Sequence, residues 1–126
     1  MFKIFYGNDT IKVRQTVFSF TDELKSKGVE VETIDVDNYE AGIFADAAGG
    51  VSLFGGEVLY VIDTPSQNEE MYKEVLNHLE HFATSPTTFL VLEGPLLALE
   101  KKKFEKYAES VEEFKAGFKE RFNTFA

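Results

Sequence analysis

Hydrophobic residues recur along this chain with two spacings. Every second residue is typical of a half-exposed strand, and every third or fourth residue is typical of a helix, and segments of the two kinds follow one another. An aromatic and β-branched run from Phe2 to Tyr6 stops at Gly7 and predicts a first strand. The apolar residues that follow recur at the spacing of one helix face: they are Val13, Val17, Phe20 and Leu24. We therefore expect a helix that is capped by Asp9 or Thr10 and ends at Gly28.

The same two periods recur to the end of the chain. Alternation from Val29 to Val36 predicts a strand exposed on one side, as at a sheet edge, and continuous apolar runs predict buried strands. The further expected strands are Val58–Ile62, Thr87–Glu93 and the final SVEEF. The further expected helices are Tyr39–Ala48, one marked by Met71 through Leu79, and Leu97–Ala108.

Five strands separated by four helices predict one α/β domain. Strands that alternate with helices form parallel sheets, because each helix carries the chain back across a face of the sheet. We therefore expect a five-stranded parallel sheet with helices on both faces.

Composition narrows the possible functions. The 126 residues, 44% of them hydrophobic, are enough for one core, and 22 acidic against 13 basic residues give a net charge of -9. Such a surface repels phosphate backbones and anionic lipid, so we expect no direct nucleic-acid or membrane binding. The chain has no cysteine, opens on the strand-like FKIFY and lacks an apolar run of about 20 residues. Together these features predict a cytoplasmic protein without signal peptide or disulfide.

The loop after the first strand, which contains Gly7, Asn8, Asp9 and Thr10, lies where a phosphate-binding loop would lie. That loop requires a second glycine, then lysine, then a hydroxyl residue, because backbone amides and the lysine hold the phosphates and the hydroxyl holds magnesium. Here those three places are taken by Lys12, Val13 and Arg14. The loop is therefore a degenerate nucleotide loop, and we expect no ATP binding.

Other candidate sites are weaker. Asp63 ends an apolar strand like a magnesium-binding acid, but an aspartate before TPS is more often a turn residue. Glu74, His78 and His81 form a stripe on one expected helix, which fits a solvated face better than a zinc site. We predict no metal, no cofactor and no catalytic residue. Two alternatives stay open: a nucleotide-binding protein with an unusual loop, and a receiver-like signalling domain with acids at Asp9 and Asp63.

The segment GGVSLFGGEVLYVID, from Gly49 to Asp63, places Leu53 and Phe54 between two glycine pairs. One interpretation is that both side chains turn inward and cap the core. The other is that the glycines let a loop protrude and present both residues to an apolar pocket of a partner. Residue types alone favour the first interpretation.

Four motifs, in order, resemble the N-terminal domain of the delta subunit of the bacterial DNA polymerase III clamp loader. They are FYGNDTIKVRQ, SLFGGEVLYVID, TTFLVLE, and VEEFK followed by ERFNTFA. The resemblance implies an AAA+-like domain that has lost nucleotide binding and grips the sliding clamp, the polymerase beta subunit, without being an enzyme. Leu53 and Phe54, with Ser52 beside them, match the family's clamp-binding residues. Other loader subunits would be bound through domains that this sequence does not contain.

The last ten residues differ from the rest. Phe118, Phe122 and Phe125 recur at nearly helical spacing, with nothing after them in the sequence to cover them. We therefore divide the chain into an α/β domain, residues 1–116, and an amphipathic tail, residues 117–126, that leads toward a second domain. The tail is expected either to fold back on the domain or to mediate weak self-association.

Overall fold

A five-stranded, all-parallel sheet organises the protein. The computed structural model describes residues 1–49 and 57–116, and its strand order is β2-β3-β4-β1-β5. The strands are β1 (Phe2–Tyr6), β2 (Glu30–Ile34), β3 (Val58–Asp63), β4 (Thr88–Glu93) and β5 (Ser110–Glu113). The predicted fold class is confirmed.

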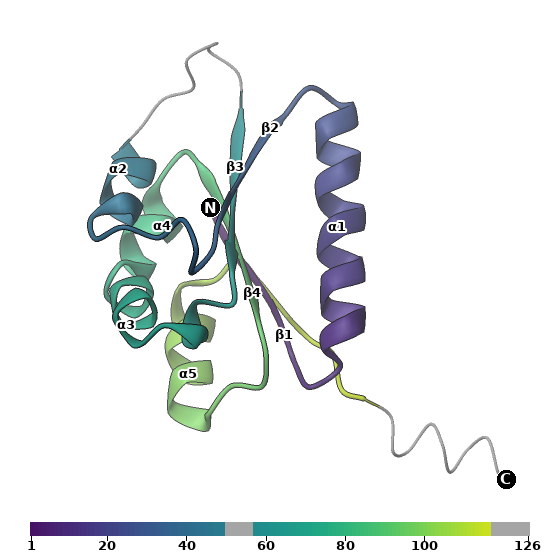
Figure 1. Ribbon diagram of the computed structural model, residues 1–126, viewed down its shortest axis with the longest axis vertical. Coiled ribbons are helices and arrows are strands. Elements are labelled where there is room, and N and C mark those ends of the chain that lie inside the picture. Colours follow the sequence, from purple (N-terminus) through teal and green to yellow (C-terminus); the bar gives the residue numbers. More distant parts are fainter. Residues whose placement is uncertain (50–56, 117–126) are drawn as a thin grey trace, which may run out of the picture.

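The helices cover the two faces of the sheet unequally. They are α1 (Thr10–Ser26), α2 (Ile43–Gly49), α3 (Glu69–Asn77), α4 (Leu79–Thr84) and α5 (Ala98–Tyr107), with a 3₁₀ turn, η1, at Pro65–Gln67. Of the helices in the described ranges, α1 alone lies on one face, and α2 through α5 lie on the other (Figure 1). Each face therefore has its own apolar core.

Strand β1 shows how the alternation of the sequence builds these two cores. Phe2, Ile4 and Tyr6 belong to the core under α2–α5, whereas Phe5 belongs to the core under α1. The larger core is centred on Phe82, whose ring lies 4.4 Å from that of Phe89. Successive side chains of a strand point to opposite faces, so one apolar run supplies both cores.

Strand order agrees with the residue pattern of each strand. The alternating β2 lies at a sheet edge and exposes Glu30 and Glu32, while the continuous apolar runs form the inner strands β3 and β4. Acidic residues on an edge strand also disfavour pairing with another chain. Receiver-like domains have the order 2-1-3-4-5, so the receiver-like alternative does not fit this topology.

Two helix predictions need correction. Helix α2 begins at Ile43 and not at Tyr39, because Gly42 has φ of 90°, which cannot continue a helix. The helix expected through Leu79 is interrupted at His78, whose N–H bonds to the oxygen of Val75, three residues back. There are thus five α-helices among the described residues and not four.

Within the two described ranges, no helix combines the length and apolar character that a bilayer span requires.

Candidate functional site

The carboxyl edge of the sheet, where ligands of α/β proteins usually bind, carries a shallow hollow of about 230 Å³. It lies between the first turns of α1 and the ends of β3 and β4. Its lining residues are Thr10, Val13, Arg14, Thr64, Gln67, Leu92, Glu93 and Gly94. This is the place that a nucleotide would occupy if the first loop bound phosphate.

The loop after β1 is short, and its backbone is already bonded to other parts of the chain. Only Gly7, Asn8 and Asp9 separate β1 from α1. The Gly7 N–H donates to the oxygen of Gly94 at 3.3 Å, and the Asp9 N–H donates to the oxygen of Phe114 at 3.1 Å. A phosphate-binding loop instead leaves its amides free for the ligand. Two of the three loop amides therefore already have carbonyl partners.

The last described residues also bond to the end of β1 and to the loop that follows it. The Ala116 N–H donates to Asn8 Oδ1 at 2.6 Å, and the Phe114 N–H donates to the oxygen of Tyr6 at 2.8 Å. We call Phe114–Ala116 the strap, because it lies across the loop that follows β1. The strap is thus bonded to the end of β1 at Tyr6 and to Asn8 and Asp9 in the loop that follows.

The remaining residues of the predicted degenerate loop have structural roles. Asp9 caps α1, since its Oδ1 accepts the N–H of Lys12 at 3.1 Å, and Thr10 is the exposed first residue of the helix. Gly7 has φ of 144°, and a Cβ there would lie 1.9 Å from the oxygen of Phe114. The glycine is thus explained by the strap and not by a phosphate.

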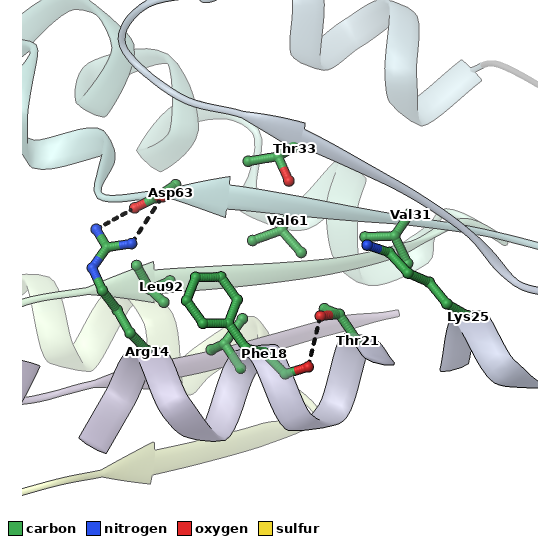
Figure 2. A pocket seen from close by; sticks show the side chains of 10 residues that line it. Arg14, Phe18, Thr21, Lys25, Val31, Thr33, Val61, Asp63 and Leu92 are labelled. Atoms are coloured by element: carbon green, nitrogen blue, oxygen red, sulfur yellow. Dashed lines mark hydrogen bonds and ion pairs between the residues drawn. The ribbon is translucent and has the colours of Figure 1, made fainter. Parts of the chain in front are cut away.

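Asp63, which sequence analysis weighed as a turn residue against a magnesium ligand, forms an ion pair. Arg14 donates to its two carboxylate oxygens at 2.9 and 3.2 Å (Figure 2). The Thr64 hydroxyl donates to Asp63 at 2.7 Å. Arg14 stands at the sequence place of the magnesium-holding hydroxyl. The cation in contact with Asp63 is therefore the guanidinium group of Arg14, which gives Asp63 a structural role.

Glu93, at the end of β4, is the buried carboxylate of this edge, and sequence analysis assigned it no role. Only 3% of it is exposed. It accepts hydrogen bonds from the Ser66 N–H and hydroxyl and from the Gly94 N–H. Burial raises the pKa of Glu93, and these three donors partly oppose the shift. Glu93 thus tethers η1 to the end of β4 and lines the hollow.

The Glu93 pKa should be measurable by carboxyl carbon NMR across a pH titration. We expect it above the ordinary glutamate value, so the folded state holds this proton more tightly than the unfolded state does. The resulting stabilisation is present below the unfolded-state pKa and is lost as pH rises through the folded-state pKa. Ser66→Ala, which removes one donor to the carboxylate, should raise the Glu93 pKa further. A folded-state pKa below the ordinary value would contradict this interpretation.

The stripe of Glu74, His78 and His81 does not lie on one helix as expected. His78 is half-buried, its Nδ1–H donates to the backbone oxygen of Glu74 at 2.8 Å, and its ring stacks on Phe82. One carboxylate oxygen of Glu74 accepts the N–H of Gly42 at 2.9 Å, which ties α3 to the start of α2. Over residues 1–49 and 57–116 no group of three or more potential metal-ligating side chains comes together.

Ser52, Leu53 and Phe54 lie outside the described residues, whereas both flanks of their segment are well defined. On one side, α2 buries Phe44 and Ala47, and the Ser85 hydroxyl donates to the oxygen of Ala48 at 3.0 Å. On the other side, β3 pairs with β2 and β4 in the middle of the sheet. The segment thus joins two elements that are fixed to the larger core and the sheet.

Comparisons with known proteins support one fold assignment. No family model matches the chain, and no curated protein sequence matches it. Fourteen chains of solved structures do match, among them the Bacillus subtilis DNA clamp loader delta protein (YqeN). That match has a TM-score of 0.69 and 16% sequence identity. It covers 98% of this chain and 41% of the other.

The described domain has the fold of part of a clamp loader delta protein. At 16% identity the likeness concerns the fold, and the chain spans less than half of the solved protein. The fold that the four motifs implied is therefore confirmed by an independent comparison of structures.

Proposed function

We propose that this chain is a non-catalytic, sliding-clamp-binding domain of a delta-like clamp-loader subunit. Leu53 and Phe54, with Ser52 beside them, would enter an apolar pocket of the clamp, the polymerase beta subunit. The observation that carries the proposal is the delta-protein fold, which extends over 98% of the chain.

The flanks of the segment support this role. A binding loop is most effective when rigid elements position it, and here α2 and the central strand β3 hold its two ends. Glycines at 49, 50, 55 and 56 permit backbone conformations that let the loop follow the shape of a pocket. A few buried aliphatic and aromatic anchors usually dominate the energy of such contacts.

The mechanism that we propose needs no nucleotide on this chain. A clamp ring in equilibrium between closed and open forms is shifted toward opening by any protein that binds the open form more tightly. The free energy would come from apolar burial, so the net charge of -9 is compatible with binding when the charge lies away from the contact. We also propose a cytoplasmic location, and assembly with other loader subunits through domains beyond this sequence.

Direct binding to a purified bacterial sliding clamp tests the proposal. The clamp would be immobilised and the domain titrated over it in a biosensor experiment. We expect saturable binding that excess free clamp abolishes. If no binding occurs at domain concentrations far above those typical of specific protein contacts, the proposed function is wrong.

The remaining alternative is a nucleotide-binding protein, and we predict that ATP does not bind. Two of the loop amides already donate to backbone carbonyl oxygens, and Lys12, Val13 and Arg14 replace the glycine, lysine and hydroxyl residue of a phosphate-binding loop. Isothermal titration calorimetry with ATP and magnesium should give no heat beyond dilution. A one-to-one isotherm with micromolar affinity would favour the alternative.

A further inference from the structure

Helix α1 leaves two large apolar side chains uncovered. Ile11 is 70% exposed and Phe18 is 56% exposed, although Val13 and Val17 on the same helix are buried. Residues seven apart lie on the same side of a helix, so Ile11 and Phe18 form one apolar face. Two exposed apolar residues in register on one face are a candidate contact surface.

Phe18 also borders a small hollow between α1 and the sheet. The hollow has a volume of about 90 Å³, and Val31, Val61 and Leu92 contribute apolar side chains to its wall (Figure 2). Among the described elements α1 is the single helix on this face of the sheet (Figure 1), and the hollow is lined by α1 and the strands alone. The α1 face, defined as Ile11, Phe18 and this hollow, could therefore accept a short apolar segment.

The strap places the tail next to this surface. Ala116 bonds to Asn8, two residues before α1 begins at Thr10, so residue 117 starts beside the first turn of the helix. Ten residues span about 15 Å as a helix, and Thr10 to Phe18 spans about 12 Å along the axis of α1. Residues 117–126 can therefore reach the whole α1 face.

The tail carries side chains suited to that face. Phe118, Phe122 and Phe125 are spaced by four and three residues, which is the spacing of one helix face. A segment attached beside its target binds at a high effective concentration, which favours it over a second copy in dilute solution. We infer that residues 117–126 pack against the α1 face, with their phenylalanines on Ile11 and Phe18.

The chain contains no tryptophan, so Phe122→Trp supplies a fluorescent reporter in the tail without background. In the full chain we expect blue-shifted emission and protection from acrylamide quenching. Adding Ile11→Ser and Phe18→Ser should abolish both effects. The matched control is Leu97→Ser with Leu99→Ser, which removes two apolar residues near α5 that are at least as exposed as Ile11 and Phe18 and should change neither. Circular dichroism establishes that each variant is folded.

Three outcomes would overturn the inference. The tryptophan could be solvent-exposed in the parent, or it could stay protected after the α1 substitutions, which would mean that the tail packs elsewhere. Protection that disappears on dilution would indicate contact with a second copy. Because the chain also lacks cysteine, a Gln15→Cys, Phe122→Cys pair gives an independent measurement. We expect an intramolecular disulfide in the monomer, and its absence under mild oxidation would count against the contact.

Discussion

Replacing Leu53 and Phe54 with alanine together should weaken clamp binding by about two to four orders of magnitude. Each anchor that is fully buried at the partner contributes roughly 1.5 to 3 kcal/mol, so their joint loss costs about 3 to 6 kcal/mol, although adjacent residues need not be additive. The free energy of unfolding should change by less than about 0.5 kcal/mol, as is usual for exposed loop residues. A biosensor titration and a urea denaturation curve measure the two quantities.

The two measurements separate the contact interpretation from the core interpretation. If Leu53 and Phe54 cap the core, the double substitution leaves cavities and costs several kcal/mol of stability, with clamp binding affected only through unfolding. Leu97→Ala with Leu99→Ala is the matched control, since these leucines are 71% and 76% exposed and lie on another part of the chain. Unchanged clamp affinity together with a lowered denaturation midpoint in the Leu53, Phe54 variant would remove the central support of the proposed contact.

The strands were predictable because their residue patterns are unambiguous. The expected Val58–Ile62 and Thr87–Glu93 runs differ from β3 and β4 by a single residue at one end, and the acidic alternation of β2 correctly indicated an edge. The pattern reports how many faces of a strand are buried, which is set by its place in the sheet. Strand order itself came only from the structure, because pairing joins residues far apart in sequence.

The helix errors have local causes that the apolar pattern hides. Met71, Val75, Leu79 and Phe82 continue one helical face across His78, so the break there leaves the spacing intact. At α2, Gly42 was the available signal, since a glycine within a short expected helix often marks its boundary. A break in a helix that preserves its hydrophobic face cannot be detected from hydrophobic periodicity alone.

At the carboxyl edge of the sheet, too, one part of the chemistry was predictable from the sequence and another part was not. The loss of the phosphate-loop residues was evident from Lys12, Val13 and Arg14. The contacts that replace them were not evident from the sequence, because Arg14 pairs with Asp63, 49 residues away, and Glu93 bonds to Ser66, 27 residues away. A single sequence indicates which chemistry is missing, whereas the contacts that take its place depend on the fold. The strap is the clearest example, since it brings Phe114 and Ala116 onto the loop after β1.

Gly7→Ala should be among the most destabilising single substitutions in the described domain. Its φ of 144° disfavours any residue with a Cβ, and that Cβ would lie 1.9 Å from the backbone oxygen of Phe114. Backbone strain and the forced shift each cost about 1 to 3 kcal/mol, so we expect a loss of about 2 to 6 kcal/mol in the free energy of unfolding. Urea denaturation at low temperature, followed by circular dichroism, measures this loss.

Gly28→Ala supplies the matched control for the close contact with the strap. Gly28 also has positive φ, 90°, but a Cβ there would have no atom within 4 Å, so only the backbone strain of about 1 to 3 kcal/mol remains. The Gly7 variant should therefore be the less stable of the two, and its Phe114 and Asp9 amides should exchange with solvent faster because the loop and the strap must separate. Equal losses in the free energy of unfolding in both variants, with unchanged amide exchange at Asp9, would mean that the strap moves away from the added Cβ at little cost. In that case the closed loop would be a weak barrier, and the prediction that ATP does not bind would rest on the missing lysine and hydroxyl alone.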